Sequence, residues 1–230
     1  MLHLQHLCCC KCNTFGVFIS PGKMLKLPQV FIIKVKHINK SARSQAFTLT
    51  DKVKEPLDLI SHLPFRLAVV SNLLALDRDW KIRKLTDLEP REMRVLLNIG
   101  SYMPIKAADI AYQSRLDSYT VSRAVKKLLA LNLIEARRDE LKKNVKNLSL
   151  NEQGKVLYQK LTQAMDERAR LLEEVLTDSE KSLFFNMLES IENKNEAILS
   201  AQASALIEAG QEAPADQKEL IRWHKKTTGK

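Results

Sequence analysis

Residues 106–150 read KAADIAYQSRLDSYTVSRAVKKLLALNLIEARRDELKKNVKNLSL, and this stretch decides the fold. Its pattern predicts two short helices joined by a tight turn and then a hairpin of two strands around a polar loop, at residues 106–114, 118–131, 133–138 and 145–150. Asp117 or Ser118 can cap the second helix, because either side chain can accept a hydrogen bond from first-turn amides. Asn132 tolerates the left-handed backbone that closes many helices. The order predicts a helix-turn-helix followed by a wing-like hairpin.

The second of these helices has two chemically different faces. At about 100° per residue, one face carries Val121, Val125 and Leu128, which suits a core. The opposite face is polar, with Tyr119, Arg123 and Lys126 flanked by Thr120, Ser122 and Lys127. An arginine can donate two hydrogen bonds to guanine in the major groove, and short hydroxyls allow close approach to bases and phosphates. On this helix alone, a solvated charged face is an equally good interpretation.

The hairpin favours the nucleic-acid interpretation, because it is basic too. The cations on or beside it are Arg137, Arg138, Lys142, Lys143 and Lys146. A basic loop of this kind can reach the adjacent minor groove or its phosphates. The helix and the hairpin together predict a surface for double-stranded DNA.

The charge distribution agrees with this. The chain of 230 residues has a net charge of +10. Residues 101–150 carry ten Lys and Arg against five acids, whereas residues 151–230 carry eleven against fourteen. A local basic patch beside an acidic scaffold suits a polyanionic partner.

Helical periodicity precedes this stretch. Apolar residues recur at a spacing of three to four from Leu59 to Leu74, which predicts an amphipathic helix over about 57–83. Another helix is expected to begin at Pro90, a favoured first helical position, and to end near Gly100.

Two long helices are expected after the hairpin, at about 151–175 and 178–209. Residues 177–180 (TDSE) fit a capping box between them. Hydrophobic residues make up 45% of the chain and aromatic residues 6%, which is typical of a helix-rich globular protein. The predicted fold is mainly α, with one domain over residues 51–209. Within it, a winged helix-turn-helix lobe spans about 90–150, and the helices at about 57–83 and 151–209 form a dimerisation part.

Both ends of the chain are expected to lie outside this domain. Residues 1–50 are interpreted as a disordered extension or in part as a mis-assigned start, with Met24 as the alternative, and residues 210–230 as a disordered tail. No cysteine follows Cys12, which points to a reducing compartment, and the CCCKC run at 8–12 lacks the paired spacing of a structural zinc site. No apolar run reaches the length of a membrane span.

Several stretches resemble the MarR family of bacterial regulators. They are EMRVL at 92–96, DIA at 109–111, TVSRAVKKL at 120–128, LIEARR at 133–138, LSLNEQG at 148–154 and LTDSE at 176–180. The resemblance covers residues 59–200 and implies a cytoplasmic, nucleoid-associated transcription regulator. It further implies a homodimer with two winged lobes that binds a palindromic operator. The helix at 118–131 would enter the major groove, with Ser118, Thr120, Ser122, Arg123 and Lys127 touching DNA, and the wing tip would enter the minor groove.

The chain departs from the family pattern at three places. The wing, where relatives often have Asp followed by Arg, reads Lys142-Lys143-Asn144. Lysine is a point charge without the planar fork of arginine, so this wing is expected to hold phosphate more than to read groove width. Asn132 replaces the usual Gly, and Glu89 replaces the usual Ser or Thr cap.

The resemblance also implies a small aromatic or phenolic effector. His62 and Arg66, one turn apart, are the candidate ligand residues, and Arg66 could pair with a carboxylate. A salt-bridged or solvated pair is the favoured alternative for these two residues.

No catalytic motif, metal spacing or cofactor loop is recognisable, so no enzyme activity or cofactor is expected. The competing function is a winged-helix module that binds proteins and not DNA.

Overall fold

The computed structural model describes residues 46–138 and 146–229, and the chain divides into two compact units, residues 1–65 and 66–230. In the first unit, the described residues 46–62 form no helix or strand. Most of the expected N-terminal extension lies outside the described residues. Helix α2 (Leu63–Leu74) begins at the end of the first unit, and the remaining elements belong to the second.

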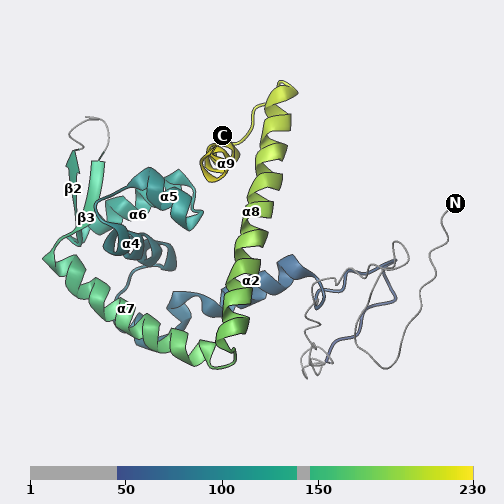
Figure 1. The fold of residues 1–230 in the computed structure, drawn as a ribbon, viewed down its shortest axis with the longest axis horizontal. Coiled ribbons are helices and arrows are strands. Elements are labelled where there is room, and N and C mark those ends of the chain that lie inside the picture. The colour runs from purple at the N-terminus through teal and green to yellow at the C-terminus, as the bar shows by residue number, and fades with distance from the viewer. Residues whose placement is uncertain (1–45, 139–145, 230) are drawn as a thin grey trace, which may run out of the picture. The chain divides into compact units, whose positions relative to one another are not determined.

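Three helices and a small sheet build one lobe of the second unit (Figure 1). The helices are α4 (Pro90–Tyr102), α5 (Ala107–Ser114) and α6 (Ser118–Ala130). The antiparallel sheet has the order β1-β3-β2, with β1 (Ile105–Lys106), β2 (Ile134–Arg138) and β3 (Lys146–Leu150). This is a winged helix-turn-helix, as the sequence predicted, and the chain is mainly helical.

Alternation along the strands sets the register of the wing. Leu148 and Leu150 are buried, while Asn147 and Ser149, which alternate with them, are only half-buried. Leu148 is directly opposite Ala136 on β2, so their side chains share the face that packs on the core. The core is closed by side chains of all three helices, among them Met93, Leu96, Ile99, Ile110, Val121 and Leu128.

Helix α7 (Glu152–Glu173) begins directly after the wing and depends on a glycine. The Asn151 side chain caps it by accepting a hydrogen bond from the Gly154 amide at 2.9 Å. A Cβ atom at Gly154 would lie 1.9 Å from the carbonyl oxygen of Leu133, at the start of the hairpin. Only glycine allows this close approach, which fixes the base of the wing against α7.

Helix α8 (Asp178–Glu208) begins with the expected capping box. The Thr177 hydroxyl accepts a hydrogen bond from the Glu180 amide at 3.3 Å, and the Glu180 carboxylate accepts one from the Thr177 amide at 2.9 Å. Helix α8 therefore begins at the position that the sequence predicted for the end of one long helix and the start of the next.

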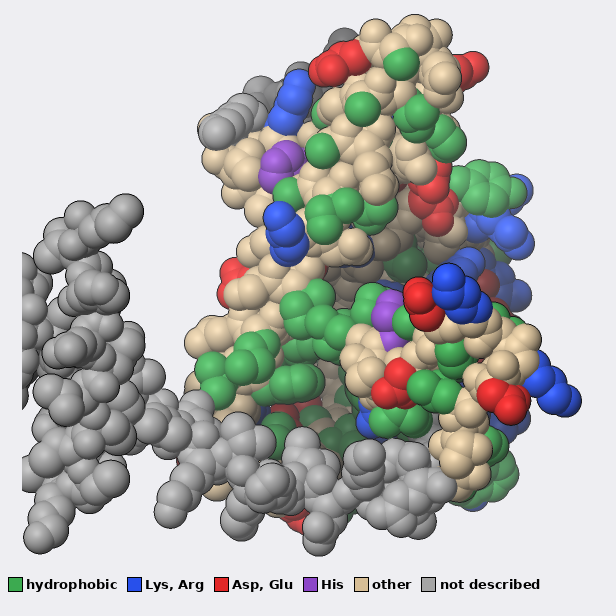
Figure 2. Space-filling model, turned by 90° about the vertical axis from the view of Figure 1, so that its right-hand side faces the viewer, with side chains coloured by type: hydrophobic (Ala, Val, Ile, Leu, Met, Phe, Trp, Pro, Cys, Tyr) green, Lys and Arg blue, Asp and Glu red, His purple; other side chains and the backbone are tan. Residues whose placement is uncertain are grey.

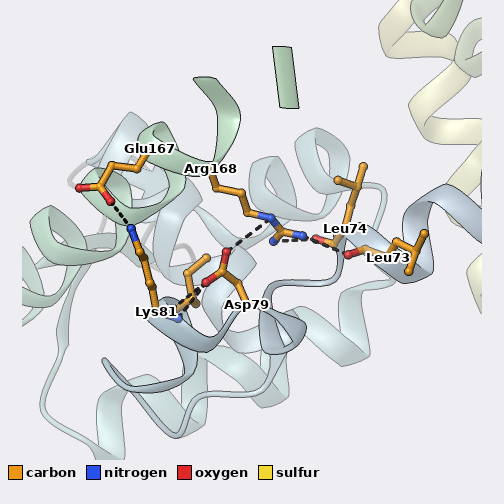
Figure 3. Close-up of polar contacts among 7 residues, drawn as sticks. Leu73, Leu74, Asp79, Lys81, Glu167 and Arg168 are labelled. Atoms are coloured by element: carbon orange, nitrogen blue, oxygen red, sulfur yellow. Dashed lines mark hydrogen bonds and ion pairs between the residues drawn. The ribbon is translucent and has the colours of Figure 1, made fainter. Parts of the chain in front are cut away.

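The continuous helix expected at 57–83 is wrong. Helix α2 ends at Leu74, and a 3₁₀ turn η1 (Leu76–Arg78) and a short helix α3 (Trp80–Arg83) follow. Figure 3 shows the reason: the Arg168 guanidinium of α7 donates hydrogen bonds to the carbonyl oxygens of Leu73 and Leu74, at 3.0 and 3.3 Å, where α2 ends. These tertiary bonds satisfy carbonyls that a continuing helix would have used.

Asp79 restarts the helix after this break. Its carboxylate accepts hydrogen bonds from the amides of Lys81 and Ile82 and lies 3.6 Å from the Nε atom of Arg168. Lys81 also pairs with Glu167 at 2.8 Å (Figure 3). This pair raises the pKa of Lys81 and lowers that of Glu167, through their mutual hydrogen bond first and their opposite charges second.

The expected disorder of residues 210–230 is also wrong. A helix α9 (Ala215–Thr228) packs against α8 (Figure 1). Low apolar content suggested disorder, but Leu220 and Trp223 of the helix are half-buried, and Ala213, just before it, is buried. Packing against α8 and against the core of the lobe therefore overrides the polar composition.

Among the described residues, no helix is both long enough and apolar enough to cross a membrane.

Candidate nucleic-acid interface

The turn between α5 and α6 positions the candidate interface. Arg115 ends α5 in the left-handed conformation, with φ of 51°, and its amide bonds back to the Ala111 carbonyl oxygen. Asp117 then caps α6 by accepting a hydrogen bond from the Thr120 amide at 2.8 Å. Two residues thus reverse the chain and fix where α6 begins.

The Thr120 hydroxyl takes part in the same cap. It donates to the second carboxylate oxygen of Asp117 at 2.7 Å. This bond first, and the bond from the Thr120 amide second, lower the pKa of Asp117 from its ordinary value of 3.8, because both stabilise the ionised form. Thr120, predicted to touch DNA, is half-buried here and already uses its hydroxyl hydrogen inside the protein.

The two faces of α6 are separated as the sequence required. Val121, Ala124 and Leu128 are buried, and Val125, expected in the core, is only half-buried. The exposed face carries most of the residues predicted to touch DNA, namely Ser118, Tyr119, Ser122, Arg123, Lys126 and Lys127. The Tyr119 side chain is 71% exposed, and the Arg123 guanidinium lies 5.8 Å from the centre of its ring.

The wing brings further cations beside this helix. Arg138 and Lys146 are directly opposite each other at the last paired position among the described residues of the hairpin, and both are exposed. Like charges at such a position repel each other, so a bound anion would stabilise this end of the wing. The neighbouring Arg137 pairs with Glu135 at 3.1 Å. Lys142 and Lys143 lie outside the described residues.

The candidate effector residues lie at or just before the start of α2. The His62 Nδ1 atom accepts a hydrogen bond from the Phe65 amide at 3.3 Å, at the start of α2. Arg66 is exposed on α2.

A different hollow lies between α4 and α5, with a volume of about 370 Å³. Its lining includes Arg94, Asn98, Ser101, Tyr102, Gln113 and Ser114. The Asn98 side-chain amide donates to the Ser114 hydroxyl at 3.0 Å, while its oxygen atom is buried and has no hydrogen-bond partner among the described residues. An arginine, an aromatic ring and several polar groups are therefore available to a small acid in this hollow.

Sequence reasoning missed the contact that α9 makes with this region. The Ser118 amide, at the first position of α6, donates to the Glu219 carboxylate at 3.1 Å. The signal in the sequence was a single tryptophan, Trp223, in an otherwise polar segment.

In the part of the chain that the structure describes, no group of three or more His, Cys, Asp or Glu side chains is arranged to hold a metal ion.

Comparison with known proteins agrees with this geometry. Residues 86–143 match the model of the MarR family, and this range contains α4, both helices of the helix-turn-helix and the first strand of the wing. No curated protein matches the chain.

Solved structures share the fold. A MarR/EmrR family transcriptional regulator from Acinetobacter sp. ADP1 is 25% identical, with a TM-score of 0.56 that covers 61% of this chain and 99% of that one. A MarR protein from Peptoclostridium difficile is 18% identical, with a TM-score of 0.55, over 64% of this chain and 94% of that one. MepR of S. aureus, solved as a complex with DNA, is 20% identical, with a TM-score of 0.53, over 58% and 98%.

The described fold is thus that of a winged helix-turn-helix transcriptional regulator. Residues 86–143 match the MarR family, and the fold is shared with solved regulators of that family.

Proposed function

We propose that this protein is a transcription regulator that binds double-stranded DNA sequence-specifically as a homodimer. The proposal rests on helix α6, which has one buried apolar face and one exposed polar face. Its buried face fixes it in the lobe, and its exposed face presents Arg123 with Tyr119 and Ser122. In a helix-turn-helix, the residues near the N-terminus of the second helix reach base edges in the major groove. Arg123 is then the residue that reads a base, because its guanidinium can bond two acceptors of guanine at once.

Arg138 and Lys146 extend the proposed interface to the DNA backbone. The repulsion between these two opposite cations is relieved when a phosphate lies between them. Lysine and arginine side chains that neutralise phosphates release counterions, so affinity through the wing falls steeply with salt. Lys142 and Lys143 stay in the proposal as further phosphate contacts.

The homodimer is supported by apolar surface that the single chain leaves exposed. This surface gathers at the end of α7, the start of α8 and the end of α2, and includes Leu73, Leu171, Val175, Phe184, Phe185 and Met187. The Val175 side chain is 81% exposed. Figure 2 faces the side of the molecule along which α8 runs and shows hydrophobic side chains gathered there. Large contiguous apolar surface of this kind is rare on monomers and typical of lasting interfaces.

A two-fold dimer would carry two copies of α6. A palindromic operator matches this symmetry, with half-sites about 10 base pairs apart from centre to centre, or a multiple of that spacing. Effector release belongs to the same proposal: a small aromatic or phenolic acid would bind in the hollow between α4 and α5, its carboxylate on Arg94 and its ring on Tyr102.

Selection from a pool of random duplexes with the full chain, followed by sequencing of the bound fraction, tests the proposal. The expected result is enrichment of one inverted repeat. On that repeat, Arg123→Ala should weaken binding by about 1–3 kcal/mol and relax preference at one base position in each half-site. Lys127→Ala should weaken all duplexes alike. Lys160→Ala, which removes an exposed lysine of α7, is the control for charge alone.

The alternative, a winged-helix module that docks an acidic protein, gives a different outcome. No duplex would then be enriched, and binding to DNA would show no preference at any salt concentration. A monomer at micromolar concentration in light scattering would overturn the homodimer separately.

A further inference from the structure

Helix α9 lies between α8 and the helix-turn-helix (Figure 1), and it touches both helices of the motif. Lys226 pairs with Asp109 in the first turn of α5 at 2.9 Å. The Thr227 hydroxyl is 3.0 Å from that of Tyr112. At the other end of the contact, the Glu219 carboxylate accepts a hydrogen bond from the first amide of α6. The C-terminal helix therefore runs along α5 and ends its contact at the N-terminus of the recognition helix.

Glu219 occupies the place of an anion there. Glu219 is only 7% exposed, and its two carboxylate oxygens lie 3.1 and 3.3 Å from the Ser118 amide nitrogen. The first amides of a helix have no partner within the helix, and the helix dipole attracts negative charge to them. A DNA phosphate uses the same kind of amide at helix N-termini. A carboxylate and a phosphate cannot both occupy this position, because they would share one donor and repel each other.

The position of α9 matters because of how a helix-turn-helix docks. The first helix crosses the DNA backbone, and the N-terminal residues of the second contact bases. Helix α9 covers the first turn of α5 at Asp109 and the first residue of α6 at Ser118. On the proposed function, we infer that α9 is a tethered competitor of DNA: in this closed state it occupies the N-terminus of the recognition helix until a duplex displaces its contacts.

A cluster of charged side chains holds α9 in this place. Arg115, in the turn of the motif, pairs with Glu196 of α8 at 2.9 Å and lies 5.8 Å from the centre of the Trp223 ring. The His224 Nδ1 atom is 3.5 Å from the same Glu196 carboxylate. The turn, α8 and α9 therefore meet at one buried carboxylate, which couples the position of α9 to the DNA-binding lobe.

The contacts between α9 and the motif can be exchanged for contacts to DNA. They are polar bonds from Glu219, Lys226 and Thr227, joined by contacts of the half-buried Trp223, whereas α9 makes its main packing with α8. The short link from Gly210 to Pro214 keeps α9 beside its target at a high effective concentration. Closure therefore lowers DNA affinity without preventing binding.

Fluorescence anisotropy titration of the full-length Glu219→Gln variant with the selected duplex tests this inference. Glutamine keeps the size and removes the negative charge, so binding should be at least about fivefold tighter than for the wild type. Glu208→Gln removes the same charge from an exposed position in the last turn of α8 and is the matched control. It should change affinity less than twofold.

A second measurement reports on α9 directly. The chain has two tryptophans, Trp80 and Trp223, so Trp80→Phe leaves Trp223 as the single reporter. When a saturating duplex displaces α9, acrylamide should quench Trp223 more strongly than in the unbound protein. Unchanged or weaker quenching in the complex would overturn the inference, even if Glu219→Gln failed to fold.

The outcomes separate the two proposals. If neither the wild type nor any variant selects or binds a duplex, the proposed function is overturned. A wild type that binds, together with Glu219→Gln no tighter than Glu208→Gln, would overturn the closed state alone. Weaker binding by Glu219→Gln would mean that α9 belongs to the DNA interface and supports binding there.

Discussion

Replacing Lys146 by glutamate should make the free protein more stable and its DNA complex weaker. Lys146 is directly opposite Arg138 at the last paired position among the described residues of the wing, and both side chains are exposed. Opposite partners in an antiparallel pair project to the same face, with Cβ atoms about 5 Å apart. The two positive charges therefore repel each other in the free protein, and Lys146→Glu converts this repulsion into attraction.

The magnitude follows from this spacing. Two unit charges about 6 Å apart in bulk water interact by about 0.7 kcal/mol, so reversing the sign changes the energy by about 1.4 kcal/mol. Screening at physiological salt reduces this by about half. The expected gain in the free energy of unfolding is about 0.5–1 kcal/mol, within the range of cross-strand charge pairs. A domain of this size should then melt roughly 1–4 °C higher.

Urea denaturation and a salt titration of DNA binding measure the two effects, at one fixed protein concentration because a dimer's stability depends on it. The slope of log affinity against log salt should decrease by about 0.9 for the lost phosphate contact. Lys146→Gln is the control, with the same loss of slope and about half of the gain in stability. Unchanged stability together with unchanged DNA affinity would refute both the opposed charges and the role of the wing.

Three further changes test the scaffold and the hollow. Gly154→Ala should lower the free energy of unfolding by about 1–3 kcal/mol, because the new Cβ must move more than 1 Å away from the Leu133 carbonyl oxygen. The control is Gln153→Ala at an exposed position, and equal urea midpoints for the two variants would contradict the prediction. Asp117→Asn should remove an acid-dependent part of stability. The folded pKa of Asp117 lies below 3.8, so the stability that its carboxylate contributes is present above that pH and is lost as the pH falls through the folded pKa. Melting curves of Asp117→Asn between pH 6 and pH 3 that match those of the wild type would argue against this cap. Arg94→Gln should weaken binding of benzoate at least about fivefold in calorimetry, and equal heats for both proteins would place the effector elsewhere.

The candidate interface could be predicted from the sequence where local rules decide it. Asp117 caps α6 and Asn132 closes it with φ of 52°, because capping depends on a few adjacent residues. The alternation at Leu148 and Leu150 predicted which face of the wing is buried. Thr120 shows the limit: its hydroxyl could bond DNA or the cap, and only the folded structure shows that it bonds Asp117.

By itself, the sequence determined the order of elements, the two faces of α6 and the basic character of the wing, since these depend on periodicity and composition along a continuous segment. Tertiary structure decided what depends on distant partners. The break after Leu74 requires Arg168, about ninety residues further on, and α9 is ordered by packing on α8 and by polar bonds to the helix-turn-helix. The meeting of Glu219 with Ser118 joins residues a hundred positions apart, and no local pattern encodes it. Helix ends and anion sites at helix N-termini leave backbone groups unsatisfied, and which distant side chain satisfies them is fixed only when the chain folds.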